Sequence, residues 1–173
     1  MRRLAEKFGL RRALYAGAKA DTLPAAIGEN TMSRLTLAQA NAIITAAFAK
    51  GRELNLKPLS VVVLDAGGHV LAFQRQDGAS NMRFDIARGK ASGALALGVS
   101  SRTLGTMAAE RPSFVASLGA IAAGGLIPVA GGVLVTGDDN SVIGAVGATG
   151  DTSDNDEAVV LEGIKAAGLT AKA

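Results

Sequence analysis

The sequence predicts one α/β domain of the α+β kind, in which a mainly antiparallel sheet is flanked by helices. Apolar residues make up 49% of the 173-residue chain, which is enough for a core of its own. Short β-branched segments follow one another through glycine-rich turns, and this pattern is typical of hairpins and therefore of antiparallel pairing. Segments with helix-start signals lie before and after these strands.

The first predicted helix begins after Thr36. Thr36 and Gln39 have the spacing of a capping box, in which each residue satisfies a free backbone N–H of the other. Apolar residues then follow at helical spacing, and Asn55 and Pro58 end the helix. These apolar residues are Leu37, Ala40, Ile44, Ala47 and Phe48.

A hairpin is predicted after this helix. Residues 59–65 form a β-branched run that predicts a strand, and residues 69–75 predict the return strand. Gly67 and Gly68 allow a tight turn between the two strands. The dipeptide at 77–78, Asp-Gly, then turns the chain away from the sheet.

The next predicted helix, over about residues 82–97, is rich in small residues, and Ser80 or Asn81 can cap it. Each glycine costs a helix interior about 1 kcal/mol relative to alanine. Gly89 and Gly93 therefore indicate that something packs very close to this backbone. A neighbouring helix or strand is the default expectation, and a flat ligand is the alternative.

The second half of the chain predicts short helices followed by strands. Residues 100–123 predict one or two helices broken near Pro112. Strands are then predicted, in chain order, over residues 124–128, 131–136 and 142–147.

Four acidic residues lie around the start of the last predicted helix, which runs to about Ala167: Asp151, Asp154, Asp156 and Glu157. Asp154 and Glu157 have the spacing of a second capping box, with Asp154 as the cap. Clustered carboxylates also suit hard cations, but their spacing matches no complete calcium loop. Capping is therefore the preferred interpretation, and no residue is assigned to a metal.

The excess positive charge lies in the first 31 residues, although the whole chain has a pI of about 9.5. Residues 1–31 carry six basic and three acidic side chains, whereas residues 32–173 carry twelve of each. A neutral body with four of the chain's five Phe and no Trp lacks the basic face and stacking aromatics of a nucleic-acid-binding module. We interpret residues 1–31 as a basic extension, either a mobile tail or an arm that packs on a neighbouring subunit, and residues 32–173 as the folded domain.

The apolar stretches are interrupted well short of the roughly 20 residues that a membrane-spanning helix needs, so no membrane partner is expected. The chain has no cysteine, which excludes disulfides, thiolate catalysis and cysteine zinc sites. The N-terminal segment lacks the apolar centre of a secretory signal. These observations favour a cytoplasmic location.

Four segments, taken in chain order, carry a resemblance to a known family. They are the strand–hairpin–strand segment ending in Asp-Gly-Ala at 62–79, the helical segment 86–91, the Gly-Gly-x-x-Pro segment 124–128, and the strand 142–147 followed by the acidic stretch 154–157. Together they resemble the GlcG/HbpS family, a haem-binding or haem-degrading type of domain. The similarity covers about residues 35–168.

The resemblance implies a five-stranded antiparallel sheet with flanking helices, somewhat profilin-like, and assembly into homo-oligomers, often octamers. Some members bind haem, some are described as haem-degrading or as redox sensors that also bind iron, and others lie beside catabolic enzymes. Three functions therefore stay open for this chain. It binds haem or a related flat ligand, or it is an enzyme of small-molecule catabolism (an isomerase, lyase or hydrolase of an organic acid or aromatic), or it is an accessory structural subunit.

The densest charged cluster of the signature is made of Arg75, Asp77, Arg88 and Lys90. Arg75 and Lys90 can hold a carboxylate or a haem propionate, and Arg88 is a further candidate for such a contact. Asp77 can accept a proton or only brace its own turn. If the protein is an enzyme, the catalytic candidates are Asp77, Lys90 and Glu157.

Glycines 124 and 125 and Pro128 are candidates for a backbone-lined slot that accepts a flat ligand, although such glycines also allow close strand contacts. Gly124 and Gly125 do not have the pattern of a phosphate loop. His69 is the sole histidine of the sequence, and a neutral imidazole can ligate haem iron. Its place beside the Gly67–Gly68 turn indicates an exposed hairpin residue, so it is not assigned as a metal ligand.

Overall fold

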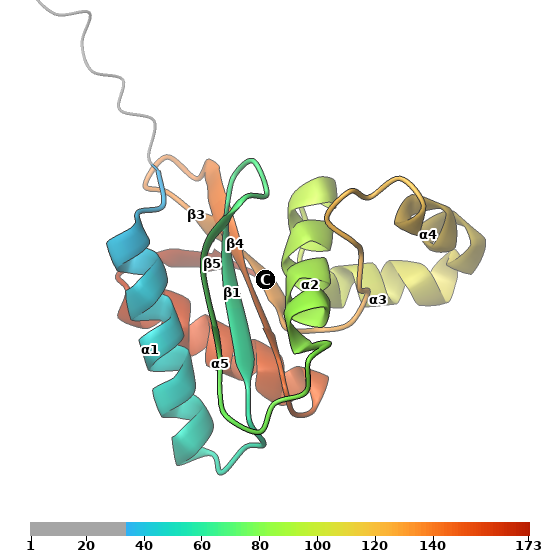
Figure 1. The fold of residues 1–173 in the computed structure, drawn as a ribbon. Coiled ribbons are helices and arrows are strands. Elements are labelled where there is room, and N and C mark those ends of the chain that lie inside the picture. The colour runs from blue at the N-terminus through green and yellow to red at the C-terminus, as the bar shows by residue number, and fades with distance from the viewer. Residues whose placement is uncertain (1–33) are drawn as a thin grey trace, which may run out of the picture. The chain divides into compact units, whose positions relative to one another are not determined.

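The β-branched segments pair into one antiparallel sheet in the computed structural model, which describes residues 34–173 (Figure 1). The strand order is β2-β1-β4-β3-β5. The strands are β1 (Ser60–Asp65), β2 (Val70–Arg75), β3 (Gly132–Thr136), β4 (Val142–Thr149) and β5 (Thr170–Lys172). The helices are α1 (Leu37–Glu53), α2 (Arg83–Leu97), α3 (Ser101–Glu110), α4 (Pro112–Gly119) and α5 (Ser153–Ala166). The predicted extension, residues 1–31, lies outside the described residues.

Apolar cores fill both faces of the sheet, because successive side chains of a strand point to opposite faces. Val61 and Val63 of β1 belong to a core with α1 and α5. Val62 and Leu64, which alternate with these two residues along the strand, belong to a second core with α2. Figure 1 shows α1 and α5 on one side of the sheet and α2 on the other. The predicted fold class, a five-stranded antiparallel sheet flanked by helices, is therefore confirmed.

The strand predicted over residues 124–128 does not form, and the fifth strand of the sheet comes from another part of the chain. Residues 124–128 form no strand; they cross the outer side of α2, where the backbone N–H of Ile127 donates to the carbonyl of Gly89 at 3.2 Å. The fifth strand is instead β5, which pairs with residues 134–136 of β3. A strand of three residues is too short for an alternating pattern to reveal it in the sequence.

The small residues of α2 allow close packing on two sides. Toward the sheet, a Cβ added at Gly147 of β4 would overlap the carbonyl oxygen of Ala87. On the opposite side, a Cβ added at Gly89 would lie 2.6 Å from Ile127. The expected close neighbour of this helix is therefore a strand on one side and the loop 124–128 on the other.

The helix starts match the sequence prediction once and differ from it twice. Thr36 and Gln39 form the predicted capping box, with backbone-to-side-chain distances of 3.0 and 3.2 Å. No side chain caps α2, whose N-cap is Met82, so the prediction of Ser80 or Asn81 as the cap is wrong. The cap of α5 is Thr152 rather than Asp154, because the chain enters the helix earlier and the nearby carboxylates have other partners.

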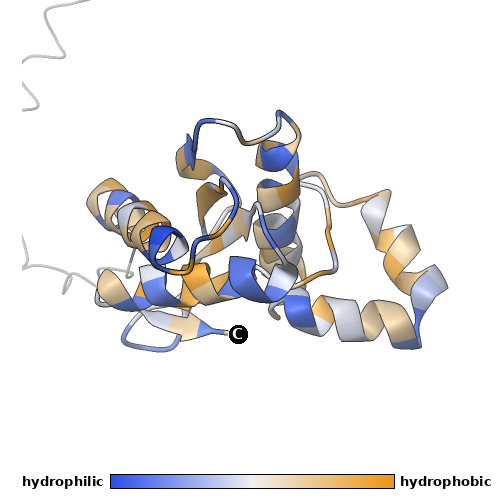
Figure 2. Ribbon diagram, turned by 90° about the horizontal axis from the view of Figure 1, so that it is seen from below, coloured by the Kyte–Doolittle hydropathy of each residue, from blue (hydrophilic) through white to orange (hydrophobic). Residues whose placement is uncertain are grey.

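Helices α3 and α4 form an arm beyond α2, and they are separated before Pro112 as predicted. Among the helices and strands of residues 34–173, α4 contacts only α3. Figures 1 and 2 show the arm reaching away from the sheet, with apolar residues along α4. No helix in this part of the chain is long and apolar enough to cross a membrane.

Candidate functional site

The structure distributes the predicted site residues over separate places. Arg75 and Asp77 lie at the end of β2, beside a hollow of about 510 Å³. Arg88 and Gly124 line a second hollow, next to the β1–β2 turn. Lys90 lies inside the protein, where its side chain is 2% exposed. A joint carboxylate site of Arg75 and Lys90 is therefore not formed.

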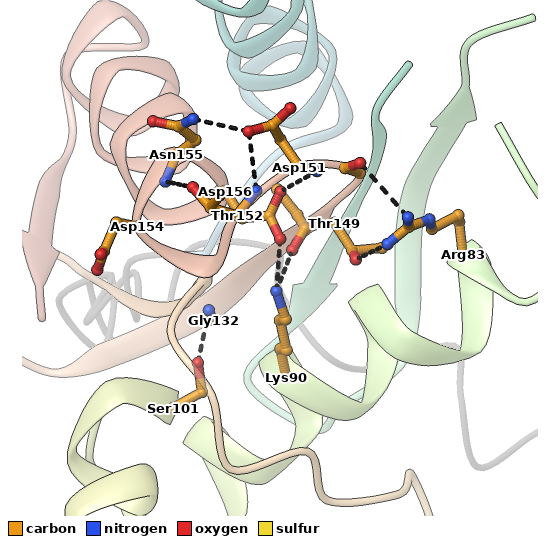
Figure 3. A network of polar contacts seen from close by, with 12 residues as sticks. Arg83, Lys90, Ser101, Gly132, Thr149, Asp151, Thr152, Asp154, Asn155 and Asp156 are labelled. Carbon is orange, nitrogen blue, oxygen red and sulfur yellow. Dashed lines mark hydrogen bonds and ion pairs between the residues drawn. The ribbon is translucent and has the colours of Figure 1, made fainter. Parts of the chain in front are cut away.

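Lys90 is held by a buried ion pair with Asp156 (Figure 3). Its Nζ donates to Asp156 Oδ2 at 2.7 Å and to the carbonyl of Ala148 at 3.0 Å. Burial lowers the pKa of Lys90 and raises the pKa of Asp156, and the hydrogen bond between them opposes both shifts. Gly131 leaves room for the ammonium, since a Cβ there would lie 2.8 Å from Nζ. Lys90 thus joins α2 to the start of α5 rather than facing a ligand.

Asp151 organises the turn between β4 and α5 (Figure 3). Its Oδ1 accepts from the Asn155 side chain at 2.7 Å and from the backbone N–H of Thr152 at 2.9 Å. Its Oδ2 accepts from the backbone N–H of Lys57 at 3.1 Å. These hydrogen bonds, that of Asn155 first, lower the pKa of Asp151 to about 2. The carboxylate therefore ties α5 to the segment that leads into β1.

Asp154 and Glu157 share one cation instead of forming a capping box. Arg102 of α3 lies 2.6 Å from Asp154 Oδ1 and 2.7 Å from Glu157 Oε2. This pairing corrects the capping interpretation, because both carboxylates point to α3 and not to the backbone of their own helix. No group of three or more potential metal ligands occurs within residues 34–173.

The hollow at the end of β2 offers charge with little enclosure. Leu56, Pro58 and Gln76 line it together with the exposed Arg75 and Asp77. The Gln76 side chain accepts from the backbone N–H of Leu59 at 2.7 Å, which fixes one wall. Of the three catalytic candidates, only Asp77 lies at this hollow. Lys90 is buried in its pair with Asp156, and the neighbouring Glu157 pairs with Arg102.

The second hollow, which we call the hairpin hollow, has a volume of about 430 Å³. It lies between the β1–β2 turn (residues 66–69), one face of α2, and residues 122–124. Its walls are mostly Gly and Ala, whose side chains are short. Its volume falls within the usual range for small-molecule sites.

His69 lies at this hollow and is oriented by Asp65. The side chain of His69 is 82% exposed, as predicted, and its Nδ1 lies 3.2 Å from Asp65 Oδ1. Asp65 Oδ1 also accepts from the backbone N–H groups of Gly67 and His69, each at 2.9 Å. Burial alone would raise the pKa of Asp65, but these hydrogen bonds and the nearby imidazole outweigh it and lower the pKa. A carboxylate on Nδ1 leaves Nε2 free to bind a ligand.

The Asp65–His69 pair was not predicted from the sequence. The sequence signal for this pair is the four-residue spacing across a glycine turn, which brings the carboxylate and the imidazole to the same side. Gly67 is part of this arrangement, because a Cβ there would lie 2.9 Å from the ring of His69. The turn therefore holds the imidazole in a defined place.

The three predicted slot residues have different roles. Gly124 lines the hairpin hollow, and a Cβ on it would overlap the hydroxyl of Ser92. Gly125 has a φ of +81°, a conformation that favours glycine. The carbonyl of Pro128 lies against α3, where a Cβ at Gly105 would approach it to 2.9 Å. Only Gly124 of the three lines the hairpin hollow.

Comparisons with known proteins place the chain among solved structures of the same fold. HbpS is 29% identical with a TM-score of 0.68, covering 83% of this chain and 97% of that one. Protein ORFY of Klebsiella pneumoniae is 26% identical with a TM-score of 0.71, covering 83% and 97%. PduOC, solved as a complex with haem, is 21% identical with a TM-score of 0.72, covering 82% and 100%. No curated protein sequence matches this chain significantly.

The family comparison covers nearly all of the described residues. The model of the family described as "Haem degrading protein HbpS-like" matches residues 35–165. This range contains α1 to α4, all but the last residue of α5, and four of the five strands. The chain therefore belongs to the HbpS-like family.

Proposed function

We propose that the protein binds a flat ligand of the haem class in the hairpin hollow. The observation that carries this proposal is the imidazole of His69, which is oriented by Asp65 beside a hollow with small-residue walls. The family description names haem degradation, and HbpS and the haem complex of PduOC share the fold. These likenesses support haem as the first ligand to test.

The residues of the hollow fit a haem group in chemistry. Nε2 of His69 would serve as the nitrogen ligand of the iron, and Asp65 would fix the tautomer through Nδ1. The Gly and Ala walls suit the flat faces of a porphyrin. A bound haem supplies a redox-active iron centre, and the protein would supply its orientation and partial shielding from water.

Hemin titration tests this proposal. Wild-type protein is expected to give a saturable Soret shift at micromolar concentration, and His69→Ala is expected to weaken binding by about ten-fold or more, since it removes the proposed ligand. Asp65→Asn should weaken binding less, because the imidazole stays. Gln74→Ala, an exposed change on β2, serves as the control. An absent wild-type shift, or equal spectra and affinities for wild type and His69→Ala, would contradict the proposal.

We also propose that the protein works as a homo-oligomer in the cytoplasm. The resemblance to the GlcG/HbpS family implies such an assembly, often an octamer. Large apolar side chains are exposed on the arm and beside it: Phe114 is 43% exposed, Ile121 80% and Val129 42%. Where such side chains gather into one contiguous patch, the patch commonly marks a contact between proteins.

Light scattering tests the assembly. Wild-type protein is expected to have a mass that is a multiple of 17.4 kDa, and Ile121→Asp is expected to shift it toward the monomer. Leu54→Asp, an exposed apolar position after α1, is the matched control and should leave the mass unchanged. A wild-type mass of one chain would refute the oligomer.

A further inference from the structure

Arg88 differs from the other basic residues of α2 because its charge has no partner. Arg83 donates to Thr149 Oγ1 at 2.9 Å, and Lys90 pairs with Asp156. The Nε of Arg88 is buried without a hydrogen-bond partner, and no acidic side chain within residues 34–173 forms an ion pair with its guanidinium. Two of the three cations on this helix are thus satisfied by the protein and the third is not.

The surroundings of Arg88 make its lack of a partner chemically significant. Arg88 is half-buried and lines the hairpin hollow, and none of the residues that line this hollow is acidic. A buried donor left without an acceptor is costly, and the cost is higher for a charged group. The hollow is therefore lined by a residue whose positive charge has no acidic partner and whose Nε–H is buried without an acceptor.

From this we infer that the hairpin hollow selects ligands that carry a carboxylate, and that Arg88 is the residue that recognises it. The inference rests on the proposed function, since it names the chemical class of ligand for the same hollow. A guanidinium presents its N–H groups as a planar fork that matches the two oxygens of a carboxylate. The same chemistry would recognise a haem propionate or a small aromatic acid.

The first experiment compares hemin with its dimethyl ester, in which both carboxylates are blocked. Arg88→Met keeps most of the side-chain volume but removes the charge, and it is expected to weaken hemin binding by about ten- to hundred-fold. The same variant should bind the dimethyl ester as wild type does, and Arg88→Lys should keep part of the preference for free hemin. Arg52→Met on α1, on the other face of the sheet, is the control.

Equal hemin affinity in wild type and Arg88→Met would overturn the inference. An equal loss for hemin and its ester would also overturn it, because the effect would then be steric. If wild type binds neither form, the proposed haem binding fails.

In that case the inference is tested by titrating the protein with 2-naphthoate and recording the NMR signal of the Arg88 Nε–H group. A saturable shift with 2-naphthoate but not with 2-naphthamide supports a carboxylate site, and no shift with either compound overturns it.

Thermal unfolding of the ligand-free protein provides an independent readout. Because Arg88 has no partner to lose, Arg88→Met is expected to unfold at the same temperature as wild type or higher. A clear drop in the unfolding temperature would mean that the guanidinium stabilises the fold. That result would contradict a role reserved for a ligand.

Discussion

Lys90→Met is expected to lower the free energy of unfolding by about 3–5 kcal/mol. The substitution leaves Asp156 buried, at 2% exposed, without its cation. It also removes the hydrogen bond to the Ala148 carbonyl, which lies at the end of β4. A buried carboxylate that loses its partner is far more costly than a surface ion pair, whose contribution is about 0–1 kcal/mol. Urea unfolding of wild type and variant measures the difference.

The pH dependence of this loss follows from the carboxyl that remains. Burial raises the pKa of Asp156, and Lys90→Met removes the hydrogen bond that opposes this rise. A group whose folded-state pKa is raised contributes stability that is present at low pH and is lost as pH rises through the folded pKa. The stability gap between wild type and Lys90→Met is therefore expected to be largest near neutral pH and to shrink toward pH 4.

A double variant separates the ion pair from the packing around it. Lys90→Met with Asp156→Asn leaves no buried charge, and the amide oxygen can still accept from the backbone N–H of Asp151, as Asp156 Oδ1 does at 3.1 Å. Its loss of stability should be smaller than the sum of the two single losses. Additive losses would show that Lys90 and Asp156 are not coupled. The surface pair of Lys50 and Glu53 is the control, and Lys50→Met should change stability little.

Local signals predicted most of the fold, because helix caps and hairpin turns act over a few residues. Thr36 with Gln39, and Gly67 with Gly68, encode their structures within four positions of the chain. The strand predicted over residues 124–128 was wrong because this segment packs against α2, which lies more than 30 positions away, and not against a strand. A short apolar run with glycines fits a strand and a buried loop equally well in sequence.

The site was harder to predict, since charged residues that are close in sequence diverge in space. Arg88 and Lys90 are two positions apart on α2, which turns them to different sides of the helix. Lys90 therefore points to Asp156 while Arg88 faces the hairpin hollow. Asp156 lies 66 positions from Lys90, so no local spacing could show that the ammonium was already paired.

Gly147→Val is expected to produce the second large effect, a loss of about 3 kcal/mol or more in the free energy of unfolding. A Cβ at this position of β4 would overlap the carbonyl oxygen of Ala87 and lie 3.1 Å from the Ala91 side chain. The main obstacle is backbone of α2, which cannot move aside as a flexible side chain can. The helix as a whole would have to lift from the sheet and open the core formed with Val62 and Leu64.

Gly147→Ala keeps the test measurable if the valine variant does not fold, and a loss of about 1–3 kcal/mol is expected from overpacking by one methyl group. Gly119→Ala, where an added Cβ meets nothing within 4 Å, is the control and should be neutral or slightly stabilising.

Chemical unfolding and hemin titration should be run on the same samples. Because α2 forms one wall of the hairpin hollow, lifting this helix moves Arg88 as well as the core. Gly147→Ala is therefore expected to weaken ligand binding together with stability, and wild-type stability in this variant would mean that α2 does not lie this close to the sheet.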